Sequence, residues 1–165
     1  MPQDIKLCTR CVMDSTTPNI QFDENGVCNY CGQFDKIISD IPNDERGKKY
    51  INELFERIKR KGKSRKYDVV VGVSGGVDST YLVHYAIKNG LRVLAVNFDN
   101  GWHSEIAVSN IKNSLEKLGV DLFTYVVDYD EMKDILLSYM NASLPWVDGP
   151  TDSAIYATLY NIASK

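Results

Sequence analysis

A glycine-rich hexapeptide, Ser74-Gly75-Gly76-Val77-Asp78-Ser79, follows directly on the apolar run at residues 69–73. Its two adjacent glycines lack Cβ atoms, so the chain can adopt positive φ and bring backbone N–H groups close to an anion. A helix that begins near Asp78 would add unpaired N–H donors and the positive end of its dipole. Two serine hydroxyls and one carboxylate flank this cradle, which suits a phosphate chain with a divalent cation. The hexapeptide therefore predicts a nucleotide site.

Four cysteines form a second candidate site. They make two C-x2-C pairs separated by sixteen residues: Cys8 with Cys11, and Cys28 with Cys31. This spacing is typical of a four-thiolate zinc site. Two disulfides are a weaker alternative, since residues 1–4 are polar and no apolar signal segment is visible. A redox pair is also weaker, because residues 1–7 provide no preceding strand of a larger sheet. Four thiolates leave no open coordination position, so we expect a structural zinc that supplies the folding energy of a small ribbon.

The segments that must position the hexapeptide alternate between apolar strands and helices. We expect strands at 68–73, 92–98 and 121–127, and helices at about 77–89, 103–118, 130–142 and 152–164. Continuous apolar strands that alternate with helices predict an α/β, Rossmann-like, doubly wound parallel sheet. Ligands of such sheets bind beyond the carboxyl ends of the strands, where the hexapeptide lies.

The domain organisation follows from composition. We expect a zinc ribbon at 1–34, a linker with an amphipathic helix at 35–66, and the main α/β domain at 67–165. Residues 35–49 are polar and rich in turn formers, and the helix is expected at 45–61. Its apolar side should dock on the main domain, with binding of a partner protein as the alternative; this side consists of Tyr50, Ile51, Leu54, Phe55 and Ile58. Only three strands are visible, so we expect the chain to be an N-terminal fragment of a longer protein.

Bulk properties restrict the class of protein. The chain has 165 residues, 44% hydrophobic and 25% charged, with a net charge of −3, which is ordinary for a globular domain. This balance gives no general case for nucleic-acid binding. The basic residues between 59 and 66 are interpreted as a solvated helix end, with an RNA or polyphosphate contact as the alternative. No apolar run is long enough to span a membrane, and we expect a cytoplasmic protein.

The hexapeptide also has a specific resemblance. It lacks the lysine of a Walker A loop and does not read G-x-G-x-x-G. Instead, S-G-G-x-D-S after an apolar strand resembles the signature of the PP-loop ATP pyrophosphatases, whose fold is adenine nucleotide alpha hydrolase-like, over about residues 67–130. The resemblance implies that ATP is cleaved between its α and β phosphates. A substrate oxygen attacks the α-phosphorus, and a nitrogen or sulfur nucleophile then displaces AMP.

Carried over residue by residue, the resemblance implies a set of site residues. Ser74, Asp78 and Ser79 would be catalytic, with Asp78 meeting Mg²⁺ and the loop holding the leaving pyrophosphate. The backbones of 71–73 and 97–99 would surround the adenosine. The nucleotide-binding residues would be Val73, Ser74, Gly75, Gly76, Val77, Asp78, Ser79, Asn97, Asp99 and Asn100. For Asp99 and Asn100, turn formation with Gly101 is the alternative.

A narrower resemblance covers the whole chain. A ribbon that begins C-x-x-C-V-M-D, a following helix and S-G-G-V-D-S together resemble the N-acetyl sugar amidotransferases of surface-polysaccharide biosynthesis. The segments 99–102 and 149–152 fit, whereas Ser153 stands where we expect histidine. The resemblance implies ATP-dependent conversion of an acetamido sugar, nucleotide- or lipid-linked, to an acetamidino sugar for lipopolysaccharide or O-antigen. It also implies ammonia from a separate glutaminase through a channel-forming subunit, and members that are longer than this chain.

Two other functions stay open. One is a tRNA-modifying PP-loop enzyme, for thiolation or lysidine synthesis, and the other is a non-catalytic ATP-binding fragment. The acidic balance and the absence of cysteine after Cys31 favour the sugar enzyme.

Four further side chains are given structural roles. His103 is expected at the surface near a helix start, with a phosphate or substrate contact as the alternative. Trp146 and Tyr156 are expected in the core, with lining of a sugar pocket as the alternative, and Asp152 is either a helix cap or a substrate ligand.

Overall fold

The computed structural model describes residues 5–165 and divides into two compact units, one up to Glu53 and the other from Leu54 to Lys165. The polar start at residues 1–4, on which the absence of a signal segment depends, lies outside the described residues. Within residues 5–165, no helix is both long enough and apolar enough to cross a membrane.

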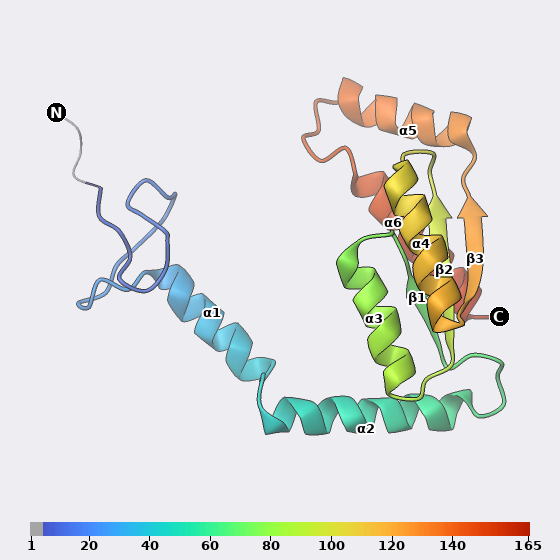
Figure 1. Cartoon of the computed structure of the whole chain (residues 1–165). Coiled ribbons are helices and arrows are strands. Elements are labelled where there is room, and N and C mark those ends of the chain that lie inside the picture. Colours follow the sequence, from blue (N-terminus) through green and yellow to red (C-terminus); the bar gives the residue numbers. More distant parts are fainter. Residues whose placement is uncertain (1–4) are drawn as a thin grey trace. The chain divides into compact units, whose positions relative to one another are not determined.

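The second unit is built on a sheet of three parallel strands (Figure 1), in the order β1 (Val69–Gly72), β2 (Val93–Asp99) and β3 (Asp121–Val126). The register pairs Val71 with Ala95 and Ala95 with Leu122. Helices α3 (Val77–Lys88) and α4 (Glu105–Leu118) connect successive strands. The chain then continues through α5 (Tyr129–Asn141) and α6 (Gly149–Ala163). The predicted α/β fold with a parallel sheet is therefore confirmed.

Helices cover both faces of β1. Val71 belongs to one hydrophobic core with Val83 of α3, whereas a Cβ at the next residue, Gly72, would lie 3.3 Å from Leu159 of α6. Successive strand residues point to opposite faces, so α3 and α6 lie on opposite sides of the sheet. The buried core on the α3 and α4 side consists of Val71, Val73, Val83, Ala86, Leu91, Val93, Ala95, Ile111 and Leu115. All six residues of β3, by contrast, are exposed.

The helix α2 (Glu45–Gly62) contributes its last residues to the second unit. Phe55 and Ile58 pack against the core, and the Phe55 ring lies 5.8 Å from that of Tyr85. For these two residues the expected docking on the main domain is confirmed.

An ion pair with a buried carboxylate fixes the turn between α2 and β1. The carboxylate of Asp68, 4% exposed, accepts hydrogen bonds from the Arg92 guanidinium, which holds the pKa of Asp68 below its usual range. The same guanidinium donates to the carbonyls of Arg65 and Gly62, each at 2.7 Å. The Arg92 side chain, directly before β2, thus joins the end of α2 to the start of the sheet.

The segment at 35–49, expected to be a turn-rich linker, is largely helical. Helix α1 (Asn29–Asp40) occupies its first part and α2 its last part. Residues 34–41 contain no Gly or Pro, and apolar side chains recur at Phe34, Ile37, Ile38 and Ile41, which is helical spacing. The turn signals at 42–44 mark only the short connection between the two helices.

Smaller corrections concern the ends of elements. Between the two cysteine pairs, Phe22 and Cys28 form an isolated antiparallel bridge. Helix α4 begins two residues later than predicted because Ser104, not His103, provides its cap: the Ser104 hydroxyl accepts the N–H of Ala107. Helix α6 begins at Gly149, since Pro150 suits a first turn that needs no N–H donor.

Candidate nucleotide-binding site and metal centre

The hexapeptide at 74–79 is a tight turn between β1 and α3, and its shape is fixed by α4. Gly75 adopts φ +79°, and a Cβ there would collide with the carbonyl oxygen of Ala107. The side-chain amide of Asn110 donates to the Gly75 carbonyl at 3.2 Å. Only glycine satisfies both the positive φ and the close approach of two main chains.

The loop leaves its backbone donors free. The N-cap of α3 is Gly76, which has no side chain to accept a hydrogen bond. Among the described residues, the N–H groups of 75–79 have no hydrogen-bond acceptor. Because they lie at the positive end of α3, they form a ready anion cradle.

The polar side chains of the loop frame this cradle. The Ser79 hydroxyl accepts the N–H of Ser74 at 3.3 Å, and the two serine oxygens are 3.4 Å apart. The hydroxyls of Ser79 and Thr80 both donate to the Gly76 carbonyl, at 3.3 and 2.9 Å. Asp78 is exposed in the first turn of α3 and makes no ion pair within the described part of the chain. A carboxylate so placed is free to bind a divalent cation.

A cavity of about 760 Å³ opens beside the loop. Its walls come from the end of β1, from β2 and the segment after it, from α3, from the first turn of α4, and from α6. The lining residues are Gly72, Val73, Ser74, Leu82, Val96, Phe98, Asn100, Trp102, His103, Ser104, Ala107, Asp152, Ile155, Tyr156, Thr158 and Leu159. Apolar walls with a few polar groups at this size are typical of small-molecule sites. The cavity lies at the carboxyl ends of β1 and β2, where the fold predicts a ligand.

The residues predicted for the nucleotide site do not all line the same space. Val73, Ser74 and Asn100 line the cavity. Gly75, Gly76 and Val77 line a groove between α3 and α4, of about 550 Å³, which also contains His84. Asp78, Ser79, Asn97 and Asp99 line neither space.

The segment after β2 forms turns from its own side chains. The Asp99 carboxylate accepts the N–H of Gly101 at 2.9 Å, and the Asn100 side-chain oxygen accepts the N–H of Trp102 at 3.2 Å. Turn formation, the alternative for both residues, is therefore present, and Asn100 lines the cavity as well. Asn97 is buried, at 8% exposed, and its side-chain oxygen has no partner among residues 5–165.

Several cavity residues were given other roles from sequence. His103 is largely enclosed rather than a surface residue, with its side chain 17% exposed. Tyr156 and Trp146 are 64% and 68% exposed, so neither is a core residue, and Tyr156 lines the cavity. Asp152 lies in the first turn of α6 and also lines it, whereas the N-cap is Asp148. One feature of the sequence could have indicated that His103 lies at the cavity: it follows Asp99 by four residues, just beyond the carboxyl end of a strand.

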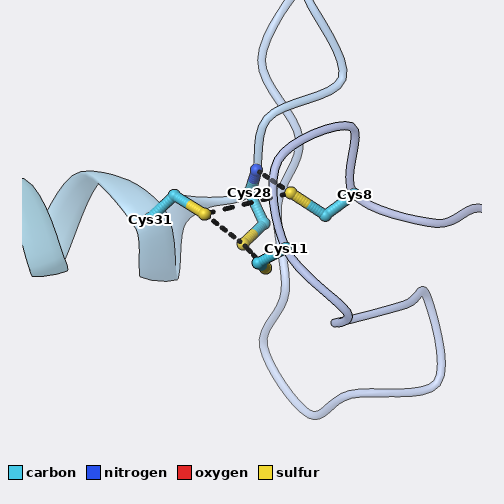
Figure 2. Close-up of side chains that lie close together, drawn as sticks. All are labelled: Cys8, Cys11, Cys28 and Cys31. Atoms are coloured by element: carbon cyan, nitrogen blue, oxygen red, sulfur yellow. Dashed lines mark hydrogen bonds between the residues drawn. The ribbon is translucent and has the colours of Figure 1, made fainter.

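The four cysteines converge on one point in the first unit (Figure 2). The sulfurs of Cys11 and Cys28 are 3.6 Å apart, those of Cys28 and Cys31 3.7 Å, and those of Cys8 and Cys31 4.0 Å. Zn–S bonds of about 2.3 Å in a tetrahedron place sulfurs roughly 3.8 Å apart. All four thiols are free, and three of them are buried. The donor set and spacing therefore fit a structural zinc.

The surroundings of the cysteines favour bound metal. Although burial opposes ionisation, the N–H groups of Arg10 and Cys28 donate to the Cys8 sulfur and lower its pKa to about 6. Burial and the neighbouring thiols raise the pKa of Cys31 to about 12. Four thiols this close cannot all ionise without a cation. Outside the cluster, Arg10 forms a two-pronged ion pair with Asp35 of α1, at 2.6 and 2.7 Å.

Comparisons with known proteins address the second unit. Residues 68–147 match the family model described as queuosine biosynthesis protein QueC. Over 74 residues the chain is 38% identical to 7-cyano-7-deazaguanine synthases from two strains of Leptospira interrogans, serovars copenhageni and Lai. This match covers 42% of the chain and 31% of each relative, so the chain spans under a third of their length.

The structure of NMN synthetase from Francisella tularensis is similar in fold, with a TM-score of 0.52 and 20% identity, over 71% of this chain and 50% of that one. The second unit has a PP-loop ATP pyrophosphatase fold. The sequence and structure matches of the second unit support the PP-loop superfamily, which the hexapeptide predicts. They do not support the N-acetyl sugar amidotransferase family, which stays a proposal.

Proposed function

We propose that the chain is part of an ATP-dependent, AMP-forming amidotransferase that converts an N-acetyl sugar into an acetamidino sugar for lipopolysaccharide or O-antigen synthesis. The observation that carries the proposal is the ring of unpaired N–H groups at 75–79, beside a cavity at the carboxyl ends of β1 and β2. The four-cysteine ribbon and the segment that begins C-x-x-C-V-M-D support the sugar substrate in particular.

The reaction has two steps. The acetamido oxygen attacks the α-phosphorus of ATP, the bond to the bridging oxygen breaks, and pyrophosphate leaves. Ammonia then adds to the activated carbon, the C–O bond breaks, AMP departs and one proton is lost. The acetamido oxygen therefore ends on AMP, and nitrogen takes its place in the sugar.

The loop acts on the leaving group. Negative charge builds on the β- and γ-phosphates as the α–β bond breaks, and the N–H groups of 75–79 with the hydroxyls of Ser74 and Ser79 would stabilise it. These donors are held in place before ATP arrives, because α4 fixes the loop through Gly75. Asp78 would bind the Mg²⁺ that accompanies the phosphates.

The cavity would hold the nucleoside. Its apolar walls suit a purine, and the main chain near Val73 together with Asn100 would provide polar contacts. Asn97 and Asp99 would act by shaping the end of β2, because neither lines the cavity. The zinc would hold the ribbon together, and ammonia would come from a separate glutaminase through a channel-forming subunit.

A 7-cyano-7-deazaguanine synthase reaction is the second candidate. The match to the QueC family model over 68–147, and the 38% identity to two such synthases, favour it. It would use the same loop and cavity, with a deazaguanine compound in place of the sugar.

One assay separates the two. The protein that contains this chain is incubated with ATP, Mg²⁺ and ammonium, in parallel with a panel of nucleotide- and lipid-linked N-acetyl sugars and with a 7-deazaguanine that carries a carboxyl group at C7. Mass spectrometry then looks for replacement of the acetamido oxygen by NH and for conversion of the carboxyl group to a nitrile. The expected result is amidination with AMP and pyrophosphate in equal amounts, lost in Asp78→Ala and retained in Asp134→Ala, a matched exposed aspartate on α5. Formation of 7-cyano-7-deazaguanine without any sugar product would refute the sugar proposal and establish the second candidate.

A further inference from the structure

We propose that His103 binds the α-phosphate of the nucleotide, and that Asp99 is the positioning residue that orients its ring. This inference rests on the proposed ATP-dependent function and adds to it a phosphate contact outside the 74–79 loop. It starts from a polar atom that the protein encloses without a partner.

The imidazole of His103 is held in an unsatisfied state. Its side chain is 17% exposed, and its Nδ1 atom is fully enclosed and has no hydrogen-bond partner among the described residues. The nearest carboxylate oxygen, Asp99 Oδ1, lies 3.7 Å away, which is too long for a hydrogen bond. A buried ring nitrogen without a hydrogen-bond partner costs free energy. A ligand that moves the ring toward Asp99 would let Nδ1 form that hydrogen bond, and this would strengthen binding of the ligand.

Part of the His103 ring lines the cavity. Because Nδ1 is enclosed, the exposed part of the ring belongs to its other atoms, and His103 lines the 760 Å³ cavity. No lysine or arginine is among the residues that line this cavity, so His103 is the side chain there that can carry a positive charge. A histidine that donates Nδ1–H to a carboxylate presents Nε2–H to an anion, which satisfies both nitrogens.

The position of His103 identifies which phosphate it would meet. It directly precedes Ser104, the cap of α4, and the first turn of α4 contacts Gly75 of the loop. Ser74 belongs both to the loop and to the cavity wall. A nucleotide with its pyrophosphate end on the loop and its nucleoside in the cavity must pass its α-phosphate close to Ser74, which lines the same cavity as His103.

Calorimetric titration with AMP and with adenosine isolates this contact, because the two ligands differ only in the α-phosphate. In His103→Ala, AMP should bind about tenfold more weakly or worse, while adenosine binds as it does to the wild type. His103→Gln keeps an N–H donor and should recover part of the loss, and Asp99→Asn should give a smaller loss. His84→Ala, which removes the exposed histidine of α3, is the matched control and should change neither ligand.

Nuclear magnetic resonance of the imidazole nitrogens gives a reading that does not depend on how the His103 variants fold. The chain has two histidines, so His84→Ala leaves the His103 ring as the one signal. AMP should shift this signal by clearly more than adenosine does. Equal losses for AMP and adenosine in a folded His103→Ala, or an unmoved signal on AMP binding, would overturn the inference while leaving the ATP function standing. If the wild-type chain binds neither AMP nor ATP, the proposed function itself fails, and the inference with it.

Discussion

The cysteine cluster offers its ligand side-chain atoms, whereas the nucleotide loop offers main-chain atoms. In the cluster, four sulfurs from two C-x2-C pairs lie within 4.8 Å of one another, and three of the cysteines are buried. In the loop, the donors are N–H groups of exposed residues such as Gly76 and Asp78, and nothing in the described chain pairs with them. One site is closed around its ligand, and the other is open to exchange.

This difference suits two tasks. A closed set of four thiolates has no free coordination position, so its metal supports structure. An open cradle of N–H groups at a helix start can bind a phosphate chain without a permanent bond and can release it again. The two sites should therefore respond to damage in opposite ways: the cluster by unfolding, the loop by losing affinity.

Loss of the zinc site should have the largest effect. Metal binding supplies on the order of 10–16 kcal/mol to structural zinc sites, so Cys28→Ser, which removes a sulfur that is 2% exposed, should unfold the ribbon. Hydrogen exchange should show loss of protection in residues 5–41, and metal analysis should fall from about one zinc per chain to none. Ser39→Ala on α1 is the control. ATP binding should persist, and its loss would show that the two sites are not independent.

Substitution of Gly75 should come next. Gly75→Ala must adopt φ +79° and push its Cβ against the Ala107 carbonyl, which costs about 1–3 kcal/mol and displaces the N–H groups. The dissociation constant for ATP, measured by calorimetry, should rise by about tenfold or more. Gly119→Ala is the matched control, since its φ of +65° is also positive but no atom lies within 4 Å of a Cβ. Equal effects of both variants on ATP would refute a specific role for the loop.

The two sites also differ in how far the sequence predicts them. Spacing alone places the four cysteines, because a C-x2-C pair fixes its own geometry locally. The hexapeptide predicts the loop equally well, since strand, turn and helix are adjacent in the chain. The cavity was predicted only in part. Its α6 wall, including Tyr156, comes from residues about eighty positions after the loop, and no local pattern reports that approach.

The errors share a physical origin. The polar residues at 35–40 were interpreted as a linker, yet spacing of Phe34, Ile37, Ile38 and Ile41 gives a helix, α1. His103 was assigned to the surface because a helix start is usually exposed, whereas its side chain is 17% exposed and lines the cavity. At 35–40 the composition suggested a linker, but the apolar periodicity gives a helix. At His103 the position in the chain suggested an exposed side chain, but the tertiary fold encloses it.

Removal of the Asp78 carboxylate tests the metal-binding role of the loop while its main-chain donors stay in place. Asp78→Ala should leave ATP binding in the absence of metal nearly unchanged, because the N–H donors remain. It should abolish the gain in affinity that Mg²⁺ provides, measured by titration with and without Mg²⁺. Asp134→Ala serves again as the control. An unchanged Mg²⁺ effect would place the cation elsewhere.

The smallest effect concerns protons at the cysteine cluster. The N–H groups of Arg10 and Cys28 lower the pKa of Cys8 to about 6, so at pH 7 this sulfur is already ionised in the preformed cluster. Zinc binding there should release fewer than four protons, and the number should rise by about one as the pH falls to 5, where Cys8 is protonated. Calorimetry in buffers of different ionisation enthalpy measures this count. Ser39→Ala, an exposed position on α1 away from the sulfurs, is the control and should not alter it. Release of all four protons at pH 7 would mean that the cluster assembles only with its metal, so that its donors, unlike those of the loop, are not ordered in advance.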